Sequence, residues 1–200
     1  MVLAIRGVIK IKKSIITLNI IINNDLQYIL NLKNVLHFIN IMKKNRNKNP
    51  VQPISGTKVP RFAGPATFAR LPELRDVESC DVAIVGIPFD AGTSYRPGAR
   101  FGPMSIRQAS RHLRTNYHPS YDVEPFKVQQ VADAGDITCN PFNIDEAIKQ
   151  IEEGANELLN KVGGIISLGG DHTIALPLLR AINRINNGPV ALVHFDAHLD

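Results

Sequence analysis

Cysteine is scarce in this sequence: Cys80 and Cys139 are the only two, and they do not form a CxxC pair. Two isolated thiols exclude a disulfide framework and a zinc site built from cysteines, and they favour a reducing compartment. We therefore expect two ordinary, partly buried thiols.

A long uninterrupted apolar run is also missing. A transmembrane helix needs ~18 or more such residues, whereas the apolar segment 15–22 is interrupted by Thr17 and Asn19 and is followed by Asp25. The sequence therefore predicts no membrane-spanning helix and no membrane partner.

A basic surface interleaved with aromatic residues, typical of nucleic-acid binding, is missing as well. The chain has 23 Lys/Arg and 18 Asp/Glu, a net charge of +5, but nine of the bases and only one acid lie in residues 1–50. The remaining 150 residues hold 14 bases and 17 acids, a net charge of −3. We therefore expect no nucleic-acid partner.

Residues 1–49 differ in composition from the rest of the chain. Ile, Asn and Lys make up 27 of the first 50 residues, and all three have A/T-rich codons. We interpret 1–49 as a low-complexity leader that is disordered, or as translated upstream DNA with Met42 as the start. The leader is poor in acids, as mitochondrial transit peptides are, but it has only two Arg and one Ser. Import directed by residues 1–41 is therefore the alternative to a cytoplasmic location.

From residue 50 the sequence alternates between short apolar runs and amphipathic segments, a pattern typical of α/β proteins. Asn143 and Glu146 form a capping-box pattern at the start of one predicted helix, and Gly163 follows its end. A second predicted helix, 103–115, places Ile106, Ala109 and Leu113 at helical spacing, and a third covers 172–185. Strands are predicted at 81–88, 127–134, 164–168 and 189–195. This order predicts parallel strands joined by helical crossovers in one domain, residues 50–200.

The last residues, ALVHFDAHLD, place Asp196, His198 and Asp200 at alternate positions. In an extended chain these side chains project to the same side. Their desolvation without a counter-charge is costly, and a divalent cation removes that cost. The preceding predicted strand leads into Gly-Gly-Asp-His, which adds His172 at the edge of the sheet where ligands gather. The sequence therefore predicts a metal centre there.

Two neighbours of this motif have other interpretations. We expect Asp171 to cap the following helix or to support a metal ligand, rather than bind the metal directly. His194 is in phase with Asp196 but lies inside the apolar run, so we interpret it as a buried core histidine. Carboxylate and imidazole ligands without a thiolate favour manganese over structural zinc or calcium. Closely spaced carboxylates indicate two ions about 3.5 Å apart, which need more ligands than this span offers.

The motifs SLGGDHT and VHFDAHLD, together with GIPFDAGTSYRPGARFGPMSIRQAS and PRFAGPATFARLP, resemble the ureohydrolase family of arginases and agmatinases, and its agmatinase branch in particular. The resemblance covers residues 58–200. It implies a three-layer αβα fold around a mainly parallel sheet, incomplete in this chain, with two Mn²⁺ per subunit. It also implies that the metal ligands are His172, Asp196, His198 and Asp200. The carboxylate that matches Asp200 orients the attacking hydroxide in the family, which makes Asp200 the expected catalytic residue.

The resemblance implies hydrolysis of a guanidino compound to urea and an amine, with agmatine to putrescine as the leading reaction. Guanidinobutyrase, guanidinopropionase and guanidine hydrolase activity are alternatives, as is an inactive ureohydrolase fragment; a deacetylase on the related fold is less favoured. The expected partners are a small guanidino substrate and, in a complete enzyme, further copies of the chain. Arg96 and Arg100 either pair with a substrate carboxylate or, as we expect, only brace their loop or a subunit interface. No substrate-binding residue is identified.

The family's second Asp-x-Asp ligand pair, its proton-shuttling histidine and its substrate-binding acids have no counterpart in this sequence. We therefore expect residues 50–200 to be the amino-terminal part of a ureohydrolase domain. We also expect the 200-residue chain alone to be inactive.

Overall fold

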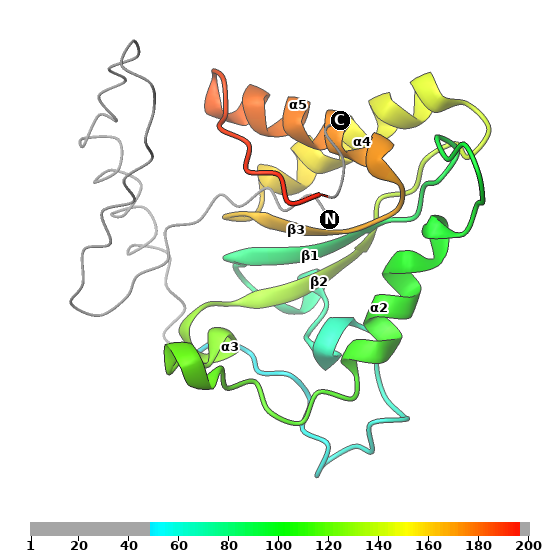
Figure 1. Ribbon diagram of the computed structural model, residues 1–200. Coiled ribbons are helices and arrows are strands. Elements are labelled where there is room, and N and C mark those ends of the chain that lie inside the picture. Colours follow the sequence, from blue (N-terminus) through cyan, green and yellow to red (C-terminus); the bar gives the residue numbers. More distant parts are fainter. Residues whose placement is uncertain (1–48, 197–200) are drawn as a thin grey trace. The chain divides into compact units, whose positions relative to one another are not determined.

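A computed structural model of the chain describes residues 49–196 (Figure 1). Residues 1–48, which make up almost all of the expected leader, lie outside the described residues. The predicted ligands His198 and Asp200 also lie outside them. In the part of the chain that is described, no helix is long and apolar enough to cross a membrane.

The described residues form a parallel sheet with the strand order β2-β1-β3. Strand β1 spans Val82–Ile87, β2 spans Val131–Asp136 and β3 spans Ile165–Gly169. The central strand, β1, pairs with both neighbours, and its residues 83–87 are all buried. A continuous run of small and branched apolar residues in β1 suits a strand that is covered on both faces.

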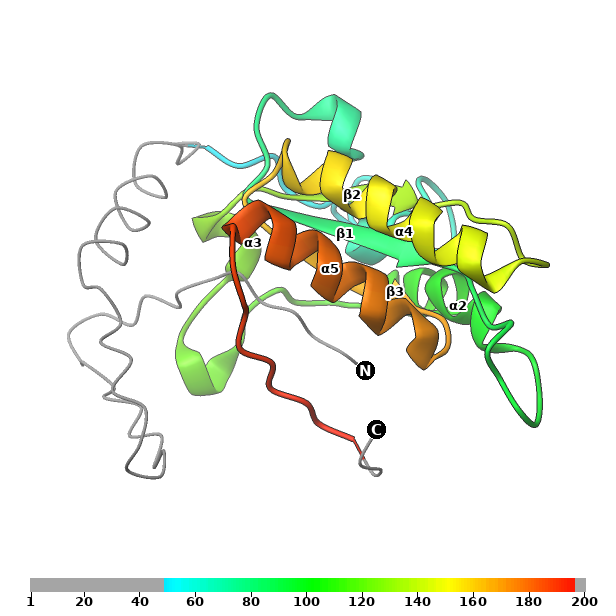
Figure 2. The same ribbon diagram turned by 90° about the horizontal axis from the view of Figure 1, so that it is seen from above.

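Helices cover both faces of the sheet and complete the three layers (Figures 1 and 2). Two helices, α4 (Ile144–Leu159) and α5 (Ala175–Asn186), pack side by side on one face. The other face is covered by α2 (Gly102–Ser110) together with the segment that contains Phe68–Arg70. The short helix α3 (Pro125–Val128) precedes β2. Short 3-10 turns connect these elements at Leu74–Asp76, Ala99–Phe101, Pro119–Tyr121 and His172–Ile174.

Side-chain alternation along β1 divides the core between the two faces. Ala83, Val85 and Ile87 belong to a large cluster with α4 and α5, whereas Ile84 packs with Leu71 in a smaller cluster on the other face. The capping box at the start of α4 is confirmed at Asn143, whose side chain accepts a 3.1 Å hydrogen bond from the Glu146 amide. The apolar stripe of α4 then buries Ala147, Ile151, Ala155, Leu158 and Leu159.

Helix α2 differs from its prediction in length and in orientation. It ends at Ser110 rather than residue 115, and the apolar residues that predicted it face outward, with Leu113 51% exposed. The buried residues of α2 include a charged one, Arg107. Its Nε and Nη2 atoms each lie 2.9 Å from an Asp133 oxygen, and its Nη1 lies 2.5 Å from Asp136 Oδ1. Pairing with two carboxylates makes burial of this charge tolerable.

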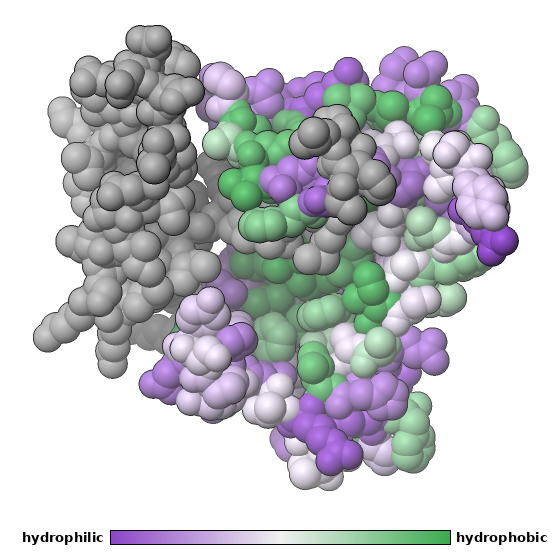
Figure 3. Space-filling view, viewed as in Figure 1, coloured by the Kyte–Doolittle hydropathy of each residue, from purple (hydrophilic) through white to green (hydrophobic). Residues whose placement is uncertain are grey.

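The predicted strand 189–195 is wrong: residues 189–196 form no strand and pair with no described strand. An extended segment becomes a strand only when a neighbour takes up its backbone hydrogen bonds, and the sequence pattern does not supply that neighbour. Its apolar side chains are therefore exposed, Phe195 by 82%. Figure 3 shows apolar surface around this segment and over the sheet beneath it. The other predicted strands exist; β2 begins at Val131 instead of residue 127 because α3 occupies the first positions.

Candidate metal centre

The candidate centre lies where the connections from two neighbouring strands diverge. The chain leaves β1 toward α2 on one face of the sheet and leaves β3 toward α5 on the other face (Figures 1 and 2). In open α/β sheets such a reversal, at the carboxyl ends of adjacent parallel strands, is the usual place for a ligand. The two loops that diverge here are residues 88–101 and 170–174.

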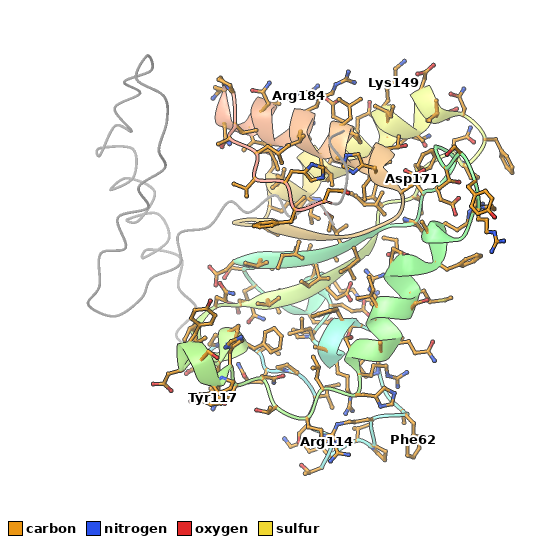
Figure 4. The ribbon with its side chains drawn as sticks, viewed as in Figure 1. Phe62, Arg114, Tyr117, Lys149, Asp171 and Arg184 are labelled. Carbon is orange, nitrogen blue, oxygen red and sulfur yellow. The ribbon has the colours of Figure 1, made fainter. Side chains whose placement is uncertain are left out.

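Asp171 joins these two loops, and its predicted capping role is confirmed (Figure 4). Its Oδ1 accepts a 2.9 Å hydrogen bond from the Thr173 amide and caps the turn that begins at His172. Its Oδ2 accepts a 2.8 Å hydrogen bond from the Gly92 amide, and its own amide donates to the Phe89 carbonyl at 2.8 Å. Asp171 thus fixes the backbone that carries His172.

Glycine is required where the two loops approach each other. A Cβ at Gly92 would lie 2.2 Å from Thr173 Oγ1, closer than any real side chain allows. Gly170 has a φ of +80°, and a Cβ there would lie 2.6 Å from the Ile87 carbonyl oxygen. Both positions depend on the absence of a side chain.

Asp90, which sequence analysis did not identify, organises the glycine-rich loop after β1. Its buried carboxylate accepts hydrogen bonds from the Gly98 amide at 2.7 Å and from Arg100 Nε at 2.6 Å. The hydrogen bond from Arg100 lowers the pKa of Asp90 from 3.8 to about 2. Arg100 therefore braces the loop, as expected, and Arg96 lies over the Tyr95 ring at 4.9 Å from its centroid. The available signal was an acid placed directly after a buried strand and before several glycines.

Three potential metal ligands meet at this edge of the sheet. One ligand atom from each of His172, His194 and Asp196 lies within 4.8 Å of the others, and no other such group occurs in residues 49–196. His194 Nε2 is 3.4 Å from Asp196 Oδ2. The rings of His172 and His194 stack with their centroids 5.2 Å apart and an interplanar angle of 24°. The structure thus brings together two of the predicted ligands, His172 and Asp196.

The interpretation of His194 as a buried core histidine is wrong. Its side chain is 22% exposed and stands among polar groups. The reason is that residues 189–196 do not enter the sheet, so His194 is not carried into the core and lies beside Asp196 instead.

The donor atoms of this group suit a divalent transition-metal ion. His194 Nε2 is buried and makes no hydrogen bond among the described residues, a deficit that costs about 1–3 kcal/mol unless another partner is supplied. Imidazole nitrogens suit zinc, copper, iron and nickel, whereas carboxylate oxygens suit manganese, so the mixed set suits a divalent transition-metal ion without selecting one. The thiols do not compete, because burial raises the pKa of Cys80 to about 11 and also raises the pKa of Cys139. Both cysteines are free, as expected.

Comparisons with known proteins identify relatives of this chain. The arginase family matches residues 80–200. The guanidinobutyrase of Pseudomonas aeruginosa is 45% identical over 157 residues, which cover 77% of this chain and 49% of that protein. The chain therefore spans about half the length of the curated relative that it matches.

Two solved structures extend the comparison to the fold. A hypothetical agmatinase from Burkholderia thailandensis superposes with a TM-score of 0.63 at 36% identity, over 69% of this chain and 44% of that one. The formiminoglutamase of Trypanosoma cruzi, solved with Mn²⁺, gives a TM-score of 0.50 at 26% identity, over 59% of this chain and 40% of that one. The parallel sheet with helices on both faces is thus shared with proteins of the arginase fold, one of which holds manganese.

Proposed function

This chain belongs to the arginase family, and from that premise we propose that it is the amino-terminal part of a manganese-dependent amidinohydrolase that converts a guanidino compound to urea and an amine. The observation that carries the proposal is the convergence of His172 and Asp196 at the edge of the sheet. Bound manganese supplies positive charge that lowers the pKa of water and stabilises negative charge in the transition state. A resonance-stabilised guanidinium needs that assistance.

The residues of this chain hold and orient the reacting groups. We assign His172 and Asp196 as metal ligands and, by their motif, extend the set to His198 and Asp200. By the same family motif, we also assign Asp200 the role of orienting the attacking water. Asp171 fixes the backbone of His172, so a change at Asp171 alters the position of the imidazole rather than the identity of a ligand.

Agmatine is the proposed substrate. A guanidino acid requires a cation for its carboxylate, usually an arginine that is free to form a paired contact. In the loop after β1, the Arg100 guanidinium is already engaged by Asp90, and Arg96 lies on the Tyr95 ring. This loop thus offers no arginine committed to a substrate carboxylate, which suits the amine end of agmatine.

Hydrolysis of a guanidino acid is the second candidate. It is favoured by the 45% identity to a guanidinobutyrase, a relative whose printed activity is on a carboxylate-bearing substrate. We propose the cytoplasm as the location, with mitochondrial import directed by residues 1–41 as the alternative.

Domain replacement tests the function and the substrate together. Residues 50–200 replace the matching segment of the P. aeruginosa guanidinobutyrase, and urea release is measured with Mn²⁺ on agmatine and on 4-guanidinobutyrate. The proposal predicts that the chimaera forms urea and that its preference shifts toward agmatine relative to the parent. A folded chimaera that binds Mn²⁺ without forming urea from either substrate contradicts the proposed activity. An unchanged preference for guanidinobutyrate contradicts the proposed substrate.

A further inference from the structure

An end of the molecule remote from the metal centre gathers arginines without acidic neighbours in sequence. Residues 50–72 and 91–121 contain eight Lys and Arg and no Asp or Glu. The two stretches meet where the turn 59–64 packs against the end of α2, at the end where Figure 4 labels Phe62 and Arg114. Although residues 51–200 are acidic overall, the fold therefore concentrates positive charge at this junction.

Two arginines connect the turn and the helix end reciprocally. Arg61 Nε donates to the Leu113 carbonyl at 3.3 Å, and Arg111 Nη2 donates to the Ala63 carbonyl at 2.9 Å. Because these acceptors are neutral main-chain oxygens, they position the two guanidiniums without neutralising them. Both Nη atoms of Arg61 and the Nη1 atom of Arg111 make no hydrogen bond within residues 49–196, and they are not buried. These donors are therefore available to a ligand.

A third arginine, Arg70, is buried against the same turn. The residue is 3% exposed, and its Nη2 donates to the Val59 carbonyl at 2.8 Å. Its Nε and Nη1 atoms are buried and have no hydrogen-bond partner among the described residues. A buried guanidinium without a counter-charge carries a high desolvation cost, and an anion held close to it lowers that cost.

We propose that this arginine cluster, formed by Arg61, Arg70 and Arg111, binds a phosphate group that is either free or part of a larger molecule. Arg61 and Arg111 donate to its oxygens, and Arg70 contributes its charge from the buried side. A phosphate dianion balances more of the three charges than a carboxylate does, and guanidinium groups match its oxygens in geometry. Arginine clusters are a recurrent means of recognising phosphate groups. The site is separate from the metal centre and does not depend on the proposed function.

Titration of the unaltered 200-residue chain with inorganic phosphate, by calorimetry at constant ionic strength, tests the proposal. Arg61→Met and Arg111→Met each keep an apolar stem but remove the charge and its donors. Arg75→Met is the matched control, because the Arg75 side chain is 79% exposed and pairs with Glu73. We expect saturable binding by the unaltered chain, an affinity at least about tenfold lower in either variant of the cluster, and unaltered affinity in the control.

Adenosine monophosphate and acetate, titrated in the same way, distinguish the kinds of anion. Tighter binding of adenosine monophosphate than of inorganic phosphate assigns the site to a larger phosphate-bearing molecule, whereas equal binding assigns it to the phosphate group alone. Either result supports the proposal. Acetate that binds as tightly as phosphate contradicts it, because a carboxylate carries only one charge.

The arginine side chains of the unaltered chain give a readout that does not depend on the folding of a variant. With ¹⁵N-labelled arginine, we expect the side-chain resonances of Arg61 and Arg111 to shift on addition of phosphate and that of Arg75 to stay unchanged. Lack of saturable binding by the unaltered chain, or shifts that spare Arg61 and Arg111, overturns the proposed site and leaves the proposed function intact. A loss of affinity in Arg75→Met equal to that in the cluster variants also overturns it, because overall charge then explains the binding.

Discussion

The Gly92 amide donates a 2.8 Å hydrogen bond to Asp171 Oδ2, and this bond ties the loop after β1 to the loop after β3. That link positions the backbone around His172, so the proposed metal centre depends on a contact between segments 79 residues apart in sequence. Disturbance of either loop is therefore expected to affect metal binding as well as stability.

Gly92→Ala tests this dependence. The added Cβ would lie 2.2 Å from Thr173 Oγ1 and 3.0 Å from Asp171 Oδ2, so the loops must separate. We expect a loss of about 1–3 kcal/mol in the free energy of unfolding and weaker Mn²⁺ binding. Gly188→Ala is the control, because a Cβ there meets nothing within 4 Å. Equal behaviour of the two variants in thermal melts and Mn²⁺ titrations would contradict the prediction.

Arg107→Met removes the cation that α2 buries against β2. Burial lowers the pKa of this guanidinium, but its hydrogen bonds to Asp133 and Asp136 outweigh that effect and raise the pKa above its ordinary value. The substitution leaves Asp133 buried without its partner, so we expect a loss of about 3–5 kcal/mol in the free energy of unfolding, measured by urea denaturation.

Arg184→Met is the matched control for Arg107→Met. Arg184 pairs with Glu152 at the surface of α5 and is largely exposed (Figure 4). The Arg184 side chain is 64% exposed, although that of Glu152 is only 13% exposed, so water screens the cation and we expect a loss of only about 1 kcal/mol. A loss in Arg107→Met no larger than in Arg184→Met would show that the buried pair does not hold α2 on the sheet.

The helix cap at Asn143 and the buried Arg107 show which features of the fold can be predicted from the sequence and which cannot. Local signals succeeded: the cap at Asn143 and the apolar run of β1 predict their elements because the causes lie within a few residues. The orientation of α2 was missed, because Arg107 turns inward only once Asp133 and Asp136 arrive from a distant strand.

The candidate site follows the same division. The motif that contains Asp196 predicted a metal site, and the loop after β3 predicted that His172 joins it; the structure brings these two residues together. The position of His194 depends on whether residues 189–195 pair with a neighbouring strand, which the sequence pattern does not determine. Asp90 organises its loop only because the folded loop brings the Gly98 amide to its carboxylate. Neither relation is encoded in a short window of sequence.

The Asp90–Arg100 pair predicts a specific dependence of stability on pH. The folded-state pKa of Asp90, about 2, lies below its ordinary value of 3.8. Its stabilising contribution is therefore complete above pH 3.8 and is lost as the pH falls through about 2. We expect wild type to be more stable than Asp90→Asn at neutral pH and the difference to shrink between those two values. Urea denaturation of both proteins at a series of pH values measures it, and a difference that grows on acidification would contradict the assignment.

Deletion of residues 1–41 tests the proposed domain boundary. The hydrophobic core of the described residues is formed from position 68 onward, so we expect the melting temperature and solubility of the shortened chain to match those of the full chain within error. A large fall in either would show that the leader belongs to the folded domain. An import assay with isolated mitochondria distinguishes a targeting leader from a protein that truly starts at Met42. Cleavage of the leader on import would refute a start at Met42.

The 200-residue chain is itself expected to form no urea, because its assigned ligands are too few for two ions that each need about five or six partners. A urea assay with agmatine and Mn²⁺ on the unaltered chain, with the chimaera as the positive control, measures this. Turnover above background from the unaltered chain would contradict the expectation.

The most direct test of the metal centre compares the chimaera with its Asp196→Ala and His198→Ala variants, measuring manganese content by elemental analysis and urea release on the same samples. If these residues hold the ion that the reaction requires, each variant loses at least one manganese per subunit and its urea-forming rate falls at least about a hundredfold. Full manganese content and parental turnover in both folded variants would contradict a metal centre at this edge of the sheet.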